Sequence, residues 1–249
     1  MKTNFIFGRK NLQDALNNNL SISHVYLKDY DNSFIPQLKT KRIPYSFKDN
    51  IFFNNLTKEK KHQNIAFILE CSNKLISLNE LISKLDNKDN AIILILDSIQ
   101  DAGNMGAILR SADAFAVDAI IFKKNNQIDP FSETIIKTST NAISYLTLCE
   151  VINLNDAIQK LKQHNFWFYA TCLENDSVPY YSQKFPSKTA FIIGNENNGI
   201  SSLVIKNSDV KIYIPQYGHV QSLNVSVATG IILSFYKTSK LIEKKVVLN

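Results

Sequence analysis

The stretch Ala91 to Ala116, AIILILDSIQDAGNMGAILRSADAFA, decides the fold class of this chain. It opens with the apolar run AIILIL, which is typical of a strand that is buried on both faces. A polar loop follows, and the spacing of Met105, Ile108, Leu109 and Ala112 then predicts an amphipathic helix. A buried strand that leads directly into a helix indicates an α/β architecture.

The chain after this stretch repeats the same alternation. We expect strands over residues 118–124, 165–171, 189–195 and 210–215, and helices over 154–165 and 223–241. Strands that alternate with helices predict a mainly parallel sheet with helices on both of its faces. In such sheets, ligands bind at the carboxyl ends of the strands.

The chain has 249 residues, which allows one large domain or two smaller ones. Its first part has a pattern of its own, with a helix expected over 10–20 and strands over 24–29 and 65–70. A helical pattern at 77–85 and the polar run DNKDN come next. We therefore expect a small α/β domain at residues 1–72, a linker at 73–88 and a second domain at 89–249.

The positive charge of the chain lies in its first third. Residues 1–72 carry 11 Lys and Arg against 6 Asp and Glu, whereas residues 89–249 carry 14 of each. A basic module attached to a neutral one indicates an accessory domain that binds a polyanion. A lysine-rich solvated surface explains the same charge equally well.

The cysteines and histidines indicate neither a disulfide framework nor a metal site. Cys71, Cys149 and Cys172 are far apart and odd in number, and the four histidines show no ligand spacing. The longest apolar run is far shorter than the roughly 20 residues of a membrane span, and MKTNFIFGRK lacks the apolar core of a secretory signal. We therefore expect a cytoplasmic protein with no membrane partner and no bound metal.

Polar side chains gather after the first strand of the second domain. Asn104 stands at the expected start of the helix, where it can act as a cap. Arg110 lies off the apolar stripe of that helix, so its side chain can face an open cleft. An ion pair between Arg110 and Asp113, three residues further on, is the ordinary alternative.

Two later strand ends have similar chemistry. Residues 194–199, GNENNG, form a glycine-containing loop around Glu196, without the spacing of a dinucleotide or phosphate-binding motif. Residues 221–230, QSLNVSVATG, place Ser222 and Asn224 at a helix entrance, where both are common caps. A tight turn and a helix cap explain each segment separately, but three such segments at one edge of a sheet predict a shared ligand site.

In this order the three segments resemble the three motifs of a known enzyme family. They read N-x5-R-x-A-x-A-F from Asn104, G-x-E-x-x-G-I from Gly194 and I-P-x-x-G-x-V-x-S-L-N-V-S-V-A from Ile214. These patterns are similar to those of the SpoU family of RNA ribose 2′-O-methyltransferases, in the SPOUT superfamily, over roughly residues 89–240. The first domain, with FGRKNLQDAL and HQNIAF, resembles the ribosomal-protein-like RNA-binding domain of the subgroup that methylates a guanosine of 23S rRNA.

The resemblance implies a deep trefoil knot in the second domain, S-adenosylmethionine as cofactor and a homodimer. Carried over by motif position, the cofactor contacts are Gly194, Ile214 and Leu223. The glycine is expected to leave room for the ligand.

The same resemblance implies the catalytic and RNA-binding residues. Arg110 lies closest to the target hydroxyl, where it orients an RNA phosphate and assists proton removal, and Asn104, Glu196, Ser222 and Asn224 position Arg110, the cofactor or the ribose. The first domain docks RNA through cations that lie along its length: Arg9, Lys10, Lys41, Arg42, Lys60 and Lys61.

The leading hypothesis for function is methyl transfer from S-adenosylmethionine to a guanosine ribose of 23S rRNA. A transfer RNA ribose methyltransferase is the second candidate, and the basic first domain argues modestly against it. A non-catalytic RNA-binding or ribosome-assembly protein of the same fold is the third. The presence of Arg110, Glu196 and Asn224 favours an enzyme.

Overall fold

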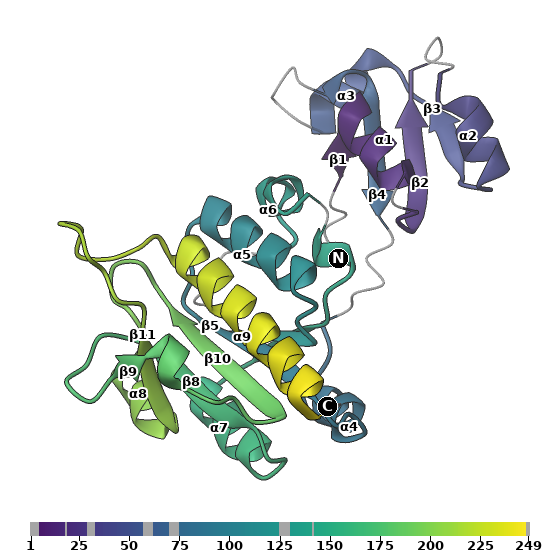
Figure 1. Cartoon of the computed structure of the whole chain (residues 1–249). Coiled ribbons are helices and arrows are strands. Elements are labelled where there is room, and N and C mark those ends of the chain that lie inside the picture. The colour runs from purple at the N-terminus through teal and green to yellow at the C-terminus, as the bar shows by residue number, and fades with distance from the viewer. Residues whose placement is uncertain are drawn as a thin grey trace. The chain divides into compact units, whose positions relative to one another are not determined.

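The computed structural model describes residues 5–17, 19–28, 33–56, 62–69, 75–124, 130–140 and 142–247, and these fall into two units (Figure 1). The first unit comprises residues 1–72 with 131–133, and the second comprises 73–130 with 134–249. This division places residues 73–88 in the second unit, whereas the sequence predicted a linker there. Its Leu78–Asp86 segment forms helix α4, whose Leu81, Ile82 and Leu85 belong to the core of the second unit.

The first unit is built on a four-stranded sheet in the order β1-β4-β2-β3. Strand β4 is antiparallel to both β1 and β2, and β2 is parallel to β3. The elements are β1 (Ile6–Phe7), α1 (Arg9–Asn17), β2 (Ile22–Leu27), α2 (Ile35–Thr40), β3 (Tyr45–Phe47), α3 (Asn50–Leu56) and β4 (Ile65–Leu69). The expected helix and both expected strands are confirmed, whereas the short elements β1, β3, α2 and α3 were not predicted.

The second unit contains a seven-stranded sheet in the order β7-β6-β5-β10-β8-β11-β9, and each of these neighbouring pairs is parallel. The expected parallel α/β architecture is therefore confirmed. The strands are β5 (Ala91–Asp97), β6 (Ala119–Lys123), β7 (Leu148–Val151), β8 (Trp167–Thr171), β9 (Val178–Pro179), β10 (Lys188–Gly194) and β11 (Val210–Tyr213). The helices are α4, α5 (Ala102–Ala114), α6 (Glu133–Thr138), α7 (Leu154–Lys162), α8 (Ser202–Asn207) and α9 (Val225–Val247).

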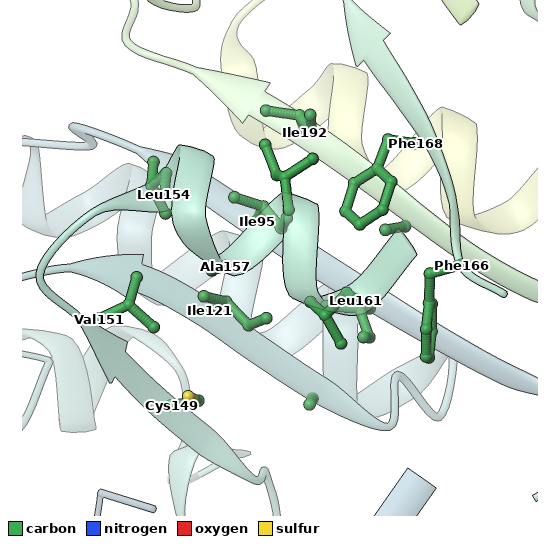
Figure 2. Close-up of a cluster of buried hydrophobic side chains, with 14 of the residues drawn as sticks. Ile95, Ile121, Cys149, Val151, Leu154, Ala157, Leu161, Phe166, Phe168 and Ile192 are labelled. Atoms are coloured by element: carbon green, nitrogen blue, oxygen red, sulfur yellow. The ribbon is translucent and has the colours of Figure 1, made fainter. Parts of the chain in front are cut away.

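The core of the second unit explains why its strands are apolar along their whole length. Helices α4, α7 and α8 pack on one face, where Leu154, Ala157 and Leu161 of α7 lie against strand residues such as Ile95 and Ile192 (Figure 2). Helices α5 and α9 pack against each other, and α9 runs alongside β10 in Figure 1. A sheet covered on both faces requires apolar side chains at consecutive positions.

The order of the strands reverses at the centre of this sheet. The chain passes from β5 to β6 and β7 on one side, whereas β10, β8 and β11 lie on the other. Gly194 at the end of β10 is in register with Asp97 at the end of β5. Loops diverge at such a reversal and leave a crevice at the carboxyl ends of the strands, where a ligand can bind.

Among the residues that the structure describes, no helix is both long enough and apolar enough to cross a membrane.

Candidate active site

A cavity of about 420 Å³ lies at the carboxyl ends of β8, β10 and β11. This volume falls within the range of small-molecule sites, roughly 300–1,000 Å³. Its wall contains the three expected cofactor contacts, Gly194, Ile214 and Leu223. Further apolar lining comes from Ile193, Ile212, Val225, Ala228 and Ile232.

Gly194 is required by the packing of the protein itself. A Cβ atom at this position would lie 2.3 Å from the carbonyl carbon of Gly199 and 2.5 Å from the nitrogen of Ile200. These are backbone atoms, so no side-chain movement can relieve the clash. The sequence interpretation had assigned this glycine to ligand access, whereas the structure shows that it also lets the following loop fold back onto its own strand.

Asn195 holds that loop in place and was missed in the sequence. Its side chain is 7% exposed, and its Nδ2 donates to the carbonyl oxygen of Ser98 at 2.7 Å. Its Oδ1 accepts from the backbone nitrogens of Asn197, at 2.8 Å, and Asn198, at 3.2 Å. The side chain therefore joins the loop after β10, which contains Glu196, to the loop after β5.

Asp97 makes a second connection between the same two loops. It is 5% exposed, and its Oδ2 accepts from the backbone nitrogen of Ser201 at 2.8 Å. Asp97 and Asn195 are polar residues at the ends of two apolar strands. This position in the sequence is the signal that could have identified them.

Three of the expected catalytic residues form one hydrogen-bonded chain. Asn224 Nδ2 donates to Asn104 Oδ1 at 2.9 Å, and Asn104 Nδ2 donates to Glu196 Oε1 at 2.6 Å. Each residue comes from a different one of the three motif segments. The structure thus brings together side chains that are 120 and 92 positions apart in the sequence.

Asp101, and not Asn104, caps helix α5. The carboxylate of Asp101 accepts from the backbone nitrogen of Asn104 at 2.7 Å. The cap that we considered for Asn104 is therefore wrong, because this residue lies within the first turn of the helix. Its side chain is left available for Glu196 and Asn224.

Asn224 both caps the start of helix α9 and takes part in the hydrogen-bonded chain. Its Oδ1 accepts from the backbone nitrogen of Ser226 at 2.9 Å and from the Ser226 hydroxyl at 2.6 Å, at the start of α9. Its Nδ2 remains free to donate to Asn104. Ser222 lies two residues earlier, exposed in the cavity wall.

Arg110 lies apart from this hydrogen-bonded chain. It is six residues beyond Asn104 on α5, about 9 Å along the helix axis, and it is exposed. Its guanidinium forms no ion pair with Asp113 or with any other residue of the described part of the chain. The alternative of a local Arg110–Asp113 pair is therefore wrong, and burial raises the pKa of the Asp113 carboxyl.

Cys172 is a further residue of the cavity wall that the sequence did not indicate. Its thiol is half-buried, and this burial raises its pKa. A protonated thiol is a weak nucleophile, so Cys172 contributes a small apolar surface at neutral pH.

The cations expected to bind RNA separate into two groups on the first unit. Arg9 and Lys10 begin α1 directly after β1, at the carboxyl ends of β1, β2 and β3. Lys41 and Arg42 precede β3, and Lys41 donates to Asn19 beside the start of β2. The two groups therefore lie at opposite ends of the sheet, about 20 Å apart for a six-residue strand. Lys60 and Lys61 lie outside the described residues.

Comparison with known proteins agrees with this geometry. The model of the SpoU rRNA Methylase family matches residues 91–234, which contain all three motif segments and the cavity. The chain belongs to the SpoU family of RNA methyltransferases. A second family model, described as RNA 2′-O ribose methyltransferase substrate binding, matches residues 5–74 of this SpoU protein.

Individual relatives of the SpoU chain have similar lengths. An uncharacterized tRNA/rRNA methyltransferase of Mycoplasma genitalium is 39% identical over 93% of this chain and 96% of its own length. The 23S rRNA (guanosine-2′-O-)-methyltransferase RlmB of Neisseria meningitidis is 30% identical over 80% of this chain and 78% of its own.

A solved structure gives the same fold for the SpoU chain. The SpoU methyltransferase AviRb of Streptomyces viridochromogenes, in complex with AdoMet, is 18% identical and superposes with a TM-score of 0.77 over 95% of this chain and 90% of that one.

Proposed function

We propose that this SpoU protein transfers the methyl group of S-adenosylmethionine to a ribose 2′-hydroxyl of RNA, with a guanosine of 23S rRNA as the first substrate to test. The observation that carries this proposal is the hydrogen-bonded chain of Asn224, Asn104 and Glu196. It ends at the same cavity whose wall contains Gly194, Ile214 and Leu223.

The cavity fits the proposed cofactor in size and in chemistry. Its volume of about 420 Å³ suits a ligand of nucleoside size. Its apolar wall suits an adenine ring and a thioether, and Ile214 and Leu223 would hold these groups through side-chain packing and backbone polar groups. When bound, S-adenosylmethionine supplies an electrophilic methyl group on a sulfonium.

The residues of the chain have to align a weak nucleophile. Methylation joins the ribose oxygen to the methyl carbon, breaks the bond from that carbon to sulfur and releases the hydroxyl proton. We assign Asn104, Glu196, Ser222 and Asn224 to holding the ribose and the cofactor in line. Holding two reacting groups in the correct geometry can remove a large part of the activation barrier. Arg110, whose guanidinium has no partner among the described residues, is assigned to an RNA phosphate beside the hydroxyl and to assisting proton removal.

The first unit is proposed to dock the RNA. Its match to a substrate-binding family supports this role, as does the resemblance to a ribosomal-protein-like RNA-binding domain. The two groups of cations, Arg9 with Lys10 and Lys41 with Arg42, would contact phosphates and supply affinity without sequence choice. With Lys60 and Lys61 they form the proposed RNA contact set.

Two further properties of the family are proposed for this chain. The segment between β11 and α9 is expected to complete a trefoil knot, since it lines one cavity together with the loop after β10. A homodimer is expected through the outer face of α9, where Val227, Ile231 and Phe235 line a shallow groove with Phe115 and Tyr180. The chain is proposed to act in the cytoplasm, where its free thiols remain reduced.

Tritiated methyl transfer from S-adenosylmethionine tests the proposal. Unmethylated 23S rRNA and unmodified tRNA are incubated separately with the full chain and with Arg110→Ala. Label in 23S rRNA that requires Arg110 supports the proposal. Label in tRNA alone moves the substrate to the second candidate, which the names of the tRNA/rRNA relatives keep open. Cofactor binding without label in either RNA overturns both substrates, and absence of cofactor binding favours a non-catalytic RNA-binding protein.

A further inference from the structure

One face of the sheet in the first unit carries aromatic and polar side chains. Along β2, Val25 and Leu27 are fully buried, whereas the alternating His24 and Tyr26 are only half-buried. Successive side chains of a strand point to opposite faces of the sheet. His24 and Tyr26 therefore belong to the face opposite the one that carries Val25 and Leu27.

Four rings form a continuous layer on this face. The centroid of Tyr26 lies 4.6 Å from that of His24, 5.0 Å from that of Phe52 and 5.7 Å from that of Phe5. Each of these rings is half-buried, so each one keeps part of its surface in water. We call Phe5, His24, Tyr26 and Phe52 the aromatic platform.

Polar and cationic groups border the aromatic platform. Ser46 on β3 is paired with Tyr26 in the sheet register, and its hydroxyl lies 2.9 Å from His24 Nε2. The exposed Lys48 places its Nζ 5.6 Å from the ring centroid of Phe52. A cation thus lies directly beside an aromatic surface.

The surrounding charge selects an anionic partner. The described residues within positions 1–72 include seven Lys and Arg but only two Asp, which gives a formal charge of +5. One of the two, Asp49, is engaged at the start of α3, where it accepts from the backbone nitrogen of Phe52 at 2.9 Å. Aromatic rings inside a field of this sign match the pattern of single-stranded nucleic-acid sites.

Packing within the first unit does not by itself account for the position of the aromatic platform. Phe7, Phe53 and Ala66 are the buried members of the small core on this face, and Phe53 stacks on His62. The platform rings lie at the edge of that core, with the polar His24–Ser46 pair at their border. Their neighbours already order them, so stacking of a base would cost little side-chain entropy.

We propose that the aromatic platform stacks an unpaired base of the RNA substrate, with Lys48 at an adjoining phosphate. This proposal rests on the proposed function, because it specifies how the first unit contacts RNA. Bases in a duplex are already stacked on each other, whereas unpaired bases present their faces to aromatic side chains. The platform therefore selects unpaired segments of RNA over helical ones.

The test measures RNA binding by the full chain through fluorescence anisotropy. The probe is a fluorescein-labelled 12-nucleotide single-stranded RNA, used alone or annealed to its complement. Tyr26→Leu removes the central ring, and Tyr26→Phe keeps it. Phe47→Leu is the matched control, because Phe47 is an exposed aromatic residue of β3 that is in register with the buried Leu27 of the other face.

We expect Tyr26→Leu to weaken binding of the single-stranded probe about tenfold, a typical loss for one stacking contact. Tyr26→Phe and Phe47→Leu are expected to bind like the unmodified chain, and duplex binding is expected to be the same for all variants. Equal binding by Tyr26→Leu and Phe47→Leu would overturn the proposal, as would failure of the unmodified chain to bind the probe.

The Tm of each variant and its methyl-transfer activity are measured separately from binding of the probe. If Tyr26→Leu lowers the Tm, His24→Ala and Lys48→Gln replace it, with Lys39→Gln as the control for loss of one exposed charge. Equal binding by these variants and their control overturns the platform. Methyl transfer by the unmodified chain reports on the proposed function alone, so an inactive chain that still loses probe binding on Tyr26→Leu fails only the proposed function.

Discussion

Asn104 donates its side-chain amide to the carboxylate of Glu196 across 92 positions of sequence, at a distance of 2.6 Å. The same Asn104 accepts from Asn224, so a single amide joins the helix after β5 to the loop after β10 and to the start of α9. A hydrogen bond to a charged acceptor contributes more than one between neutral groups. This position therefore links all three motif segments through one side chain.

Asn104→Ala is expected to lower kcat by about ten- to a hundredfold, since the loss of a hydrogen bond to a charged group costs roughly 1.5–3 kcal/mol. Asn104→Asp is expected to lose at least as much, because it places a second carboxylate beside Glu196. Steady-state methyl transfer measures both effects. Asn207→Ala is the matched control, since it removes an amide–amide bond of 2.7 Å to Asn155 on the opposite face of the sheet. Equal losses for Asn104→Ala and the control would mean that the network is structural.

Asn195→Ala is expected to weaken cofactor binding and to lower the free energy of unfolding by about 1–3 kcal/mol, because it leaves buried backbone groups without partners. Asn195→Asp keeps the acceptor for Asn197 but loses the donor to Ser98. Its effect on stability is expected to be at least as large, because a carboxylate oxygen then faces the carbonyl oxygen of Ser98 in a buried position. Calorimetric titration with S-adenosylhomocysteine and urea unfolding separate the two effects, and unchanged affinity in both variants would contradict a positioning role.

Gly194→Ala and Gly199→Ala are expected to differ in severity although the substitution is the same. Gly199 has a φ of 65° with open space around its missing Cβ, so alanine costs about 1–2 kcal/mol of backbone strain alone. At Gly194 the added Cβ meets backbone atoms at 2.3 Å and 2.5 Å, which forces the loop to move. Gly194→Ala should therefore lose cofactor binding in calorimetry, and Gly199→Ala should retain most of it. If Gly199→Ala loses more cofactor binding than Gly194→Ala, the backbone conformation at Gly199 controls the cavity, and the close packing at Gly194 does not.

These sites also show how far the sequence could be interpreted. The apolar run at 91–96 predicted a buried strand, because only a sheet covered on both faces tolerates it. The motif segments predicted that Asn104, Glu196 and Asn224 would share one edge. Periodicity carries no information on contacts between distant loops, so the Asn195–Ser98 bond and the clash that excludes alanine at Gly194 required coordinates. The linker was misjudged because the amphipathic pattern of 77–85 does not specify which core it covers.

Cys172 gives a chemical test of the cavity that does not depend on activity. Burial raises the pKa of its thiol, and burial also raises the pKa of Cys149 to about 12. The thiolate is the form that reacts with iodoacetamide, so a raised pKa means slow alkylation at pH 7 and faster alkylation as pH increases. In the folded chain we expect this pH dependence for Cys172 and almost no reaction at Cys149, which is fully buried.

Saturating S-adenosylhomocysteine is then expected to slow alkylation of Cys172 severalfold, because this thiol lies in the cavity wall. Peptide mass spectrometry of timed samples measures each cysteine separately, and Cys172→Ser identifies the signal. Adenosine at the same concentration tests whether the nucleoside part alone protects. If calorimetry shows that S-adenosylhomocysteine binds while the alkylation rate of Cys172 stays unchanged, the cofactor occupies another site and the assignment of Gly194, Ile214 and Leu223 is wrong.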